Sequence, residues 1–507
     1  MLCVLDYGSQ YTQLIARRLR SQGFFTQVLP GNLSPQAVAA YAPDGIILSG
    51  SPRSVGTGFD PDPGLLSLGV PVLGLCFGYQ FLAQHLGGRV AAATHREYGA
   101  AMVSKTPAGR RDPLTAKLSQ TTPVWMSHGD SVVDLPPSAE LILESAGKPA
   151  GFVVPSRKLW GLQFHPEVYH TPEGKLLLEA FARDICRLSP DWNLRAELGE
   201  IKAKLAKELH GVDEVVCAVS GGVDSTVLAV LLSQVCKVRA LFVDHGFLRA
   251  YDIRNLRRVF QHFPNISLEV VNAQERFWAA LDGVSDPETK RLEIGRLFVR
   301  TFAEHVGEKH FTHLAQGTIY SDVIESAAVA HGGAANIKSH HNVGGFPQDA
   351  RVQLVEPLRP FFKDEVRELG VLLGIDSEIL HQHPFPGPGL AIRCIGELRR
   401  ERIEILRRAD EIFYEELVRR DMYLRTWQAF VALLPVRTVG VMGDQRSYEH
   451  ALAIRAVSSV DAMTAEVTEF SLAELLPIAS RLINEVRGIN RVVYDLTSKP
   501  PGTIEWE

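Results

Sequence analysis

The chain has 507 residues, of which 46% are hydrophobic and 22% charged, a composition that excludes collagen-like, low-complexity and wholly disordered architectures. Its 53 basic and 58 acidic residues give a net charge of −5, so the chain as a whole lacks a basic field for nucleic acid. No apolar run approaches the roughly 18 residues of a membrane span, and six cysteines without a Cys-x-x-Cys pair indicate a reducing compartment. We therefore expect a cytoplasmic protein of about three domains, with no nucleic-acid or membrane partner.

The first part of the chain, residues 1–187, alternates short apolar runs with helical patterns. The apolar runs at 2–8, 45–50, 70–76 and 159–164 predict strands, and 12–23 is one of the helical patterns between them. Strands separated by helices are typical of a doubly wound, mostly parallel sheet. A closing helix from 174 ends at the Ser-Pro-Asp-Trp-Asn segment, which places the first boundary near 188.

The rest of the chain divides into two further patterns. In residues 188–382 a helical pattern is followed by an apolar strand pattern, a glycine-rich turn and another helical pattern. This order predicts a second doubly wound domain. Glycine and proline cluster at 381–393, and the long charged helix pattern that follows has Leu406, Ala409, Phe413 and Leu417 on one face. The predicted fold class is two doubly wound, mostly parallel α/β domains, followed by a small α+β domain at 383–507.

Cys76 lies in a pattern that suits a nucleophile. The segment from Gly74 to Gln80 follows an apolar run and leads into a helical pattern, which predicts a sharp strand-to-helix turn. A helix N-terminus lowers the pKa of a thiol, and the amide after the cysteine is placed to donate to an oxyanion. The alternative is a buried cysteine without a chemical role.

The His165-Pro166-Glu167 segment supplies the groups that Cys76 lacks. It ends an apolar strand, and residues i and i+2 of an extended chain point the same way. His165 is therefore a candidate base toward Cys76, and Glu167 is a candidate for orienting its imidazole. A lone segment of this kind would more often be a turn with a satisfied histidine.

Together these motifs resemble the class I (triad type) glutamine amidotransferase family over residues 1–187. The resemblance implies that glutamine is hydrolysed through a thioester on Cys76, with release of ammonia. It also implies that Gly50, Phe77 and Gln80 serve the oxyanion hole and the glutamine site. The family usually has Gly-Gly-Pro where this chain has Gly50-Ser51-Pro52, so Ser51 would be strained if its position requires a positive φ.

A glycine-rich segment between an apolar strand and a helix predicts a phosphate-binding loop, because backbone N–H groups at a helix N-terminus cradle phosphate. The segment lacks the lysine of kinase-like loops and resembles the signature of the ATP pyrophosphatase family, which cleaves ATP between its α- and β-phosphates. The resemblance implies that Asp224 binds Mg²⁺ with the pyrophosphate, that Val243 lies at adenine and that Gly317 is on the nucleotide side. It also implies that Lys363 reaches the ATP phosphates and the substrate; the alternative is a surface lysine at the start of a helix. The predicted ATP-binding residues of the loop are Ser220, Gly221, Gly222, Val223, Asp224, Ser225 and Thr226.

The segment 338–345 is glycine-rich and resembles the start of a mobile lid. It contains His340 and His341, but no cysteine or patterned third ligand lies nearby, so we do not predict zinc.

Over its whole length the chain resembles the family of glutamine-hydrolysing GMP synthetases, most clearly at 383–393, 436–448 and 495–507. The resemblance implies that ATP adenylates xanthosine monophosphate (XMP) and that ammonia from glutamine displaces AMP to give GMP. It implies XMP contacts by Lys499, Thr503 and Glu505, and a homodimer formed through the C-terminal domain. Two alternatives are an ATP pyrophosphatase acting on another substrate, such as deamido-NAD or tRNA, and a non-catalytic nucleotide sensor.

Overall fold

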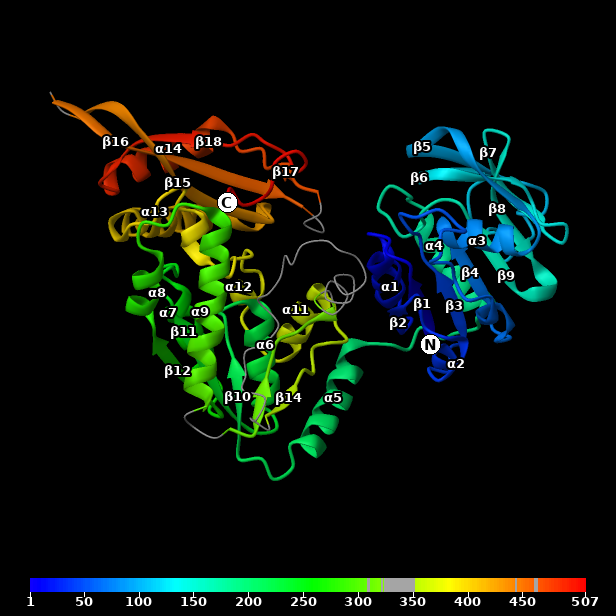
Figure 1. Cartoon of the computed structure of the whole chain (residues 1–507), viewed down its shortest axis with the longest axis horizontal. Coiled ribbons are helices and arrows are strands. Elements are labelled where there is room, and N and C mark those ends of the chain that lie inside the picture. Colours follow the sequence, from blue (N-terminus) through cyan, green and yellow to red (C-terminus); the bar gives the residue numbers. More distant parts are fainter. Residues whose placement is uncertain (308–310, 321, 323–351, 443–444, 460–463) are drawn as a thin grey trace. The chain divides into compact units, whose positions relative to one another are not determined.

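The computed structural model describes residues 1–307, 311–320, 322, 352–442, 445–459 and 464–507. The chain forms two compact units, Met1–Glu197 and Leu198–Glu507 (Figure 1). The predicted division into three domains at 1–187, 188–382 and 383–507 stays a prediction. None of the helices in these described ranges combines the length and apolar character needed to cross a membrane.

The first unit is built on a nine-stranded sheet with the order β2-β1-β3-β4-β9-β8-β7-β5-β6. Its first five strands pair in parallel and include the four apolar runs that the sequence predicts as strands. Their interior residues are buried, as expected for strands covered on both faces. These strands are β2 (Thr26–Pro30), β1 (Leu2–Asp6), β3 (Gly45–Leu48), β4 (Val72–Leu75) and β9 (Leu159–Leu162).

The other half of this sheet is antiparallel and was not foreseen from the sequence. It consists of β8 (Lys148–Val154), β7 (Glu140–Ser145), β5 (Arg89–Lys105) and β6 (Thr121–Asp134). Buried and exposed residues alternate along much of β6, because one face of this extension packs inward and the other meets solvent. The main helices of the unit are α1 (Thr12–Ser21), α2 (Pro35–Ala39), α3 (Phe77–His85) and α4 (Gly174–Glu179).

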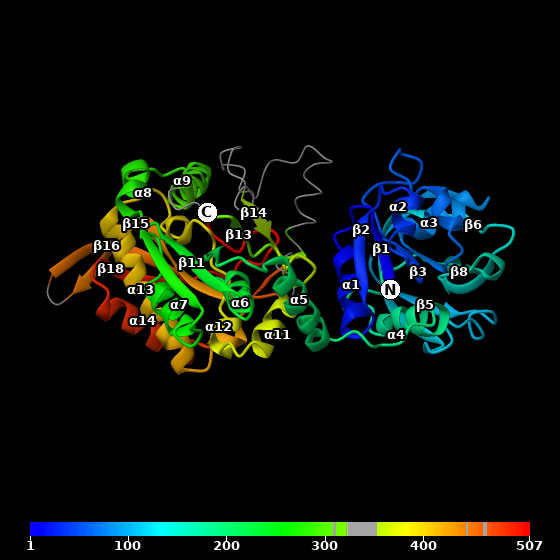
Figure 2. The ribbon, with the colours of Figure 1, turned by 90° about the horizontal axis from the view of Figure 1, so that it is seen from below.

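The second unit contains a five-stranded parallel sheet with the order β12-β11-β10-β13-β14, which confirms the second predicted α/β pattern. Helices α6 and α7 lie on one face of it, and α8 and α9 lie on the other (Figure 2). The strands are β10 (Glu214–Ala218), β11 (Lys237–Asp244), β12 (Ile266–Asn272), β13 (His313–Ala315) and β14 (Gln353–Val355). Helix α5 (Leu194–Glu208) begins in the first unit and ends in the second. The other helices are α6 (Val223–Leu232), α7 (Asp252–Phe260), α8 (Gln274–Leu281), α9 (Pro287–Gly307), α11 (Lys363–Leu372) and α12 (Ser377–Leu380).

The last part of the second unit is a small α+β layer, as predicted. Strand β16 pairs antiparallel with β15 and β17 and parallel with β18. The predicted face of the long helix is buried, and its side chains share one apolar core with residues of β11 and α9. This core continues across residue 383, where the sequence places a boundary. The elements are α13 (Arg400–Arg419), β15 (Gln428–Met442), β16 (Gln445–Ser458), β17 (Glu466–Val467), α14 (Leu472–Glu485) and β18 (Ile489–Tyr494).

Candidate active sites

Cys76 occupies the predicted turn between β4 and α3. Its backbone has φ 51° and ψ −99°, a conformation that a non-glycine residue adopts only under constraint from its surroundings. The turn is packed so closely that a Cβ on Gly74 would lie 2.5 Å from the carbonyl oxygen of Gly78. A Cβ on Gly78 would in turn lie 2.6 Å from the carbonyl oxygen of Leu48. The two glycines are therefore required for the strand and helix to approach and hold the thiol at the turn.

His165 and Glu167 form a buried pair close to Cys76. Nδ1 of His165 lies 2.7 Å from Oε1 of Glu167, and both side chains are almost inaccessible to solvent. Burial alone lowers the pKa of His165, but the Glu167 carboxylate and the neighbouring Cys76 side chain leave this pKa well above its ordinary value. The geometry therefore favours an imidazolium beside the sulfur atom.

Cys76 and His165 line a cavity of about 850 Å³ in the first unit. Gln80 also lines it and donates from its side-chain amide to the carbonyl oxygen of Asp130 at 2.8 Å. Gly50 lies behind the imidazole, since a Cβ there would be 3.1 Å from Cε1 of His165. The Phe77 ring is buried against Tyr7 and does not face the cavity. The group of Phe77 that can donate a hydrogen bond in the site is therefore its backbone N–H.

Ser51 does not have the strained backbone that the resemblance to the amidotransferase family made conceivable. Among the described residues, the non-glycine positions with positive φ include Cys76 but not Ser51. The Ser51 hydroxyl accepts a hydrogen bond from the backbone N–H of Arg53 at 3.2 Å. A serine therefore fits this turn without the strain that the sequence raised as a concern.

The predicted phosphate loop joins β10 to α6 in the second unit. Gly221 has φ +81°, which a side chain would disfavour, and the loop opens on a separate cavity of about 420 Å³. The hydroxyl groups of Ser225 and Thr226 donate to the carbonyl oxygen of Gly222 at 3.1 and 2.9 Å. These two hydrogen bonds hold the loop in shape. Gly317 packs behind the loop, since a Cβ built on Gly317 would lie 3.2 Å from the backbone nitrogen of Ser225.

Asp224 and Lys363 meet in this cavity although they lie far apart in sequence. Lys363, the first residue of α11, donates from Nζ to Oδ2 of Asp224 at 2.5 Å. The other oxygen of Asp224 is buried without a hydrogen-bond partner among the residues described. Val243, near the end of β11, lines the same cavity, and the buried His245 follows it with its pKa lowered to about 4 by desolvation.

The three C-terminal residues predicted to bind XMP have different surroundings. The backbone of Lys499 pairs with Ala465, whose carbonyl oxygen accepts from the Lys499 N–H at 2.7 Å. Thr503 is exposed, and its hydroxyl donates to the Glu505 carbonyl oxygen at 2.5 Å. Glu505 accepts a bidentate pair of hydrogen bonds from Arg393, at 2.8 and 3.1 Å. None of the three belongs to the wall of the 420 Å³ cavity as the described residues form it.

Parts of the chain, and the chain as a whole, are similar to known proteins. Residues 3–185 match the family "Glutamine amidotransferase class-I", and residues 415–506 match the family "GMP synthase C terminal domain". A glutamine-hydrolysing GMP synthase of Rhodopseudomonas palustris is 47% identical over 100% of this chain and 96% of its own length. One of Chlorobium phaeobacteroides is 48% identical over 99% of each chain. A solved structure from Thermoplasma acidophilum, described as a putative GMP synthase subunit, is 31% identical, with a TM-score of 0.34 over 37% of this chain and 93% of its own.

The chain belongs to the glutamine-hydrolysing GMP synthases. It is therefore a ligase that makes GMP with glutamine as the nitrogen donor, as the resemblance of the whole sequence implied. The alternatives of another amidated or thiolated substrate and of a non-catalytic sensor are set aside by this result. The predicted lid at 338–345, with His340 and His341, lies outside the described residues.

Some residues that line the cavity of the second unit were not singled out from the sequence. Arg249 and the segment 382–387 line the 420 Å³ cavity of the second unit. In the sequence this segment marks a domain boundary and, from residue 383 on, carries part of the resemblance to the GMP synthetases, but no ligand contact is predicted for it. Arg249 follows the end of β11, and ligands of open parallel sheets bind outside the carboxyl ends of the strands, so its position was a usable signal. No comparable signal marks Ile294 and Phe298 of α9, which line the cavity as ordinary apolar helix residues.

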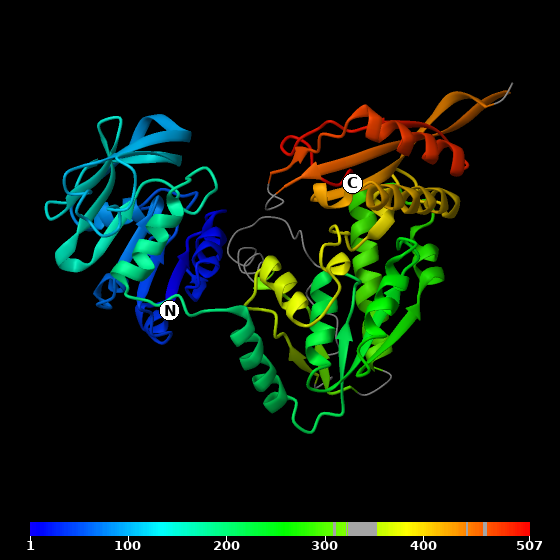
Figure 3. The same cartoon turned by 180° about the vertical axis from the view of Figure 1, so that it is seen from behind.

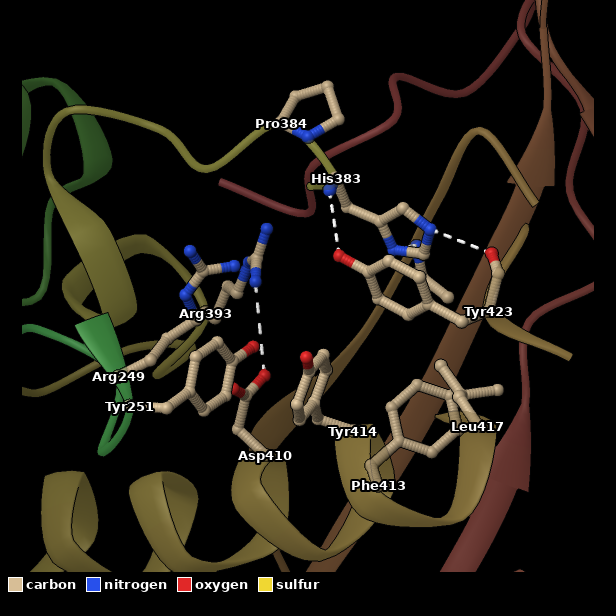
Figure 4. A pocket seen from close by; sticks show the side chains of 11 residues that line it. Arg249, Tyr251, His383, Pro384, Arg393, Asp410, Phe413, Tyr414, Leu417 and Tyr423 are labelled. Atoms are coloured by element: carbon tan, nitrogen blue, oxygen red, sulfur yellow. Dashed lines mark hydrogen bonds and ion pairs between the residues drawn. The ribbon is translucent and has the colours of Figure 1, made fainter. Parts of the chain in front are cut away.

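A buried cluster of charges supports this wall (Figure 4). Arg249 pairs with Asp252 at 2.8 Å, and Arg393 lies 3.9 Å from Asp410 on α13. Burial raises the pKa of Asp410, against the lowering effect of the arginines. His383 lies in the same cluster: its backbone N–H donates to the Tyr423 hydroxyl at 2.8 Å. These contacts connect α13 to the segments that border the 420 Å³ cavity.

Proposed function

We propose that the first unit hydrolyses glutamine with Cys76 as nucleophile, His165 as acid and base, and Glu167 as the group that orients the imidazole. The observation that carries this proposal is the buried His165–Glu167 pair beside a cysteine held at a strained turn. The raised pKa of His165 suits its imidazole to the role of the base that takes the thiol proton as Cys76 attacks.

The reaction then follows from the positions of these groups. The Cys76 thiolate attacks the carboxamide carbon, and the oxyanion accepts from the backbone N–H of Phe77 and from the loop at Gly50. The His165 imidazolium gives its proton to the departing amine, so ammonia leaves and a thioester remains. Water next attacks the thioester while His165 takes its proton, which releases glutamate and restores the sulfur. Gln80, which lines the cavity, is proposed as a contact for the bound glutamine.

We propose that the cavity of the second unit binds ATP through the loop at 220–226. The backbone of the loop faces the β- and γ-phosphates, while Val243 lies against adenine and Lys363 binds phosphate oxygens. The C2 oxygen of XMP attacks the α-phosphorus, pyrophosphate leaves, and ammonia then displaces AMP from C2 to give GMP. Gly317 supports the loop from behind.

Asp224 fits the proposed role of a Mg²⁺ ligand. One of its carboxylate oxygens is buried without a partner among the described residues, and hard cations prefer carboxylate oxygen. When bound, the ion would offset the charge of the departing pyrophosphate. Lys363, which contacts the other oxygen, supplies a second positive charge at the same place.

The C-terminal segment is proposed to bind XMP through Lys499, Thr503 and Glu505. Lys499 is held by backbone hydrogen bonds to Ala465, so its ammonium extends from a fixed point toward a nucleotide phosphate. Glu505 is engaged with Arg393, so it acts in this proposal together with that guanidinium.

We further propose a homodimer formed through the C-terminal layer. Its sheet and helices expose apolar side chains that a monomer would leave in water, at Val439, Val441, Tyr448, Leu472 and Leu476. Val441→Glu should shift the protein toward monomer in sedimentation velocity. An unchanged sedimentation coefficient together with an unchanged dissociation constant of the dimer would contradict the proposal that this surface forms the dimer.

The catalytic proposal for the first unit is tested by Cys76→Ala. The variant should lose GMP formation from glutamine but retain it when ammonium chloride replaces glutamine, because the thiol serves amide hydrolysis alone. Cys186→Ala, at a thiol whose pKa burial raises to about 12, is the matched control and should retain both activities. Loss of the ammonium-dependent activity in a folded Cys76→Ala protein would contradict the separation of the two sites.

A further inference from the structure

A lysine that the reaction does not use is completely buried in the second unit. Lys290 lies in the first turn of α9 with a relative exposure of 0%. Its ammonium donates to the carbonyl oxygen of Cys394 at 2.9 Å and to the carboxylate of Glu507. The same carboxylate accepts from the backbone N–H of Gly396 at 2.7 Å. Glu507 ends the C-terminal segment 495–507, here called the tail. Figures 1 and 3 both place the C-terminal end of the chain beside the start of α9.

This contact joins three segments that are distant in the sequence. Helix α9 continues from Lys290 into the wall of the nucleotide cavity, where Ile294 and Gly295 are one turn further on. Cys394 directly follows Arg393, whose guanidinium binds Glu505 in the tail. The tail is thus fixed to the cavity wall at residue 507 and to the neighbouring segment at residue 505.

A buried ammonium needs a charged partner, because desolvation makes an unpaired ion costly. Glu507, whose side chain is 6% exposed, is the carboxylate that pairs with Lys290. The tail must therefore be docked for Lys290 to stay buried as an ion. An apolar residue would serve simple packing at this position better than an ion pair does, so the charge pair is suited to fixing one register of the tail.

We propose that Lys290 and Glu507 are positioning residues for XMP: their ion pair holds the segment 495–507 in the register that presents Lys499 to the nucleotide. This inference rests on the proposed role of the tail in XMP binding. Neither residue touches a reacting atom. The pair acts by fixing the backbone from which Lys499 extends.

Glu507→Gln tests the pair, because it removes the charge and keeps the shape of the side chain. Hydrogen exchange followed by mass spectrometry should show faster exchange in 495–507, including the Lys499 amide that is bonded to Ala465. The KM for XMP in the ammonium-dependent reaction should rise about tenfold or more, the effect of losing one charge-assisted contact. The KM for ATP and glutamate release by the first unit should stay unchanged.

Two comparisons separate this role from general stabilisation. Glu469→Gln, at an exposed carboxylate in the same layer, is the matched control and should change neither exchange nor the KM for XMP. Glu507→Asp keeps the charge and should recover part of the loss in the KM for XMP. A fall in kcat with unchanged KM values, or faster exchange spread over the whole second unit, would identify a structural role and overturn the proposal.

The remaining outcomes are also decisive. Unchanged exchange at 495–507 in Glu507→Gln would overturn the positioning pair. Faster exchange there with an unchanged KM for XMP would overturn it too, and would leave the proposed function intact if Lys499→Met still raises that KM. A normal KM in Lys499→Met would instead contradict the proposed role of Lys499, while the exchange result would still decide whether the pair holds the tail.

Discussion

Replacing Glu167 by glutamine removes the charge behind His165 and keeps the shape of the side chain. Oε1 of Glu167 lies 2.7 Å from Nδ1 of His165, and both groups are buried, so bulk water cannot substitute for the lost carboxylate. The pKa of His165 is raised against the effect of burial largely by this carboxylate. In Glu167→Gln the pKa of His165 should fall, and a smaller fraction of the imidazole should be protonated beside Cys76.

The size of the effect follows from the kind of contact that is lost. A hydrogen bond to a charged group is worth about 1.5–3 kcal/mol, and about 1.4 kcal/mol corresponds to a factor of ten. We therefore expect glutamine-dependent kcat/KM to fall by roughly ten- to a hundredfold. Activity that needs the imidazolium is lost as the pH rises through the pKa of His165. Because the substitution lowers that pKa, the alkaline limb of the pH profile should move to lower pH.

The assay is glutamate release over a range of pH, with ammonium-dependent GMP formation measured on the same protein. Glu179→Gln is the matched control, because Glu179 forms a surface pair with Arg183 at 3.1 Å and should not affect either reaction. Full glutaminase activity in Glu167→Gln, or a fall without any movement of the alkaline limb, would refute the proposed orienting role of Glu167.

Three further changes test other parts of the protein. Asp224→Asn should abolish GMP formation from both glutamine and ammonium while basal glutamate release persists; ATP-dependent adenylation of XMP at the normal rate would contradict the metal-binding role. Lys499→Met should raise the KM for XMP by roughly ten- to a hundredfold and leave the KM for ATP nearly constant in steady-state kinetics, since a charge-assisted bond is lost. Gly74→Ala should destabilise the first unit by about 1–3 kcal/mol in urea unfolding, because its Cβ would lie 2.5 Å from the Gly78 carbonyl oxygen; an unchanged midpoint would show that the turn can relax.

Local patterns in the sequence were sufficient for strands β1, β3, β4 and β9, for the cysteine turn, and for the glycine-rich turn between β10 and α6. Each of these depends on neighbours in the chain: apolar runs form buried strands, and glycines permit turns that bring a strand and a helix together. The pairing of Cys76 with His165 was inferred from motifs rather than from spacing, and the two residues do line one cavity. The antiparallel extension was missed because its alternating residues at 121–134 are not flanked by helices.

Contacts between distant segments were decided only by the tertiary structure. The sequence marks Asp224 and Lys363 separately, but only packing of α11 near the loop brings their charges within 2.5 Å. Lys290 reads as one surface lysine among many, because no local pattern shows that folding removes it from water. Its need for Glu507 appears only when α9 and the tail meet, since the strength of an ionic contact depends on burial, and burial depends on the whole fold.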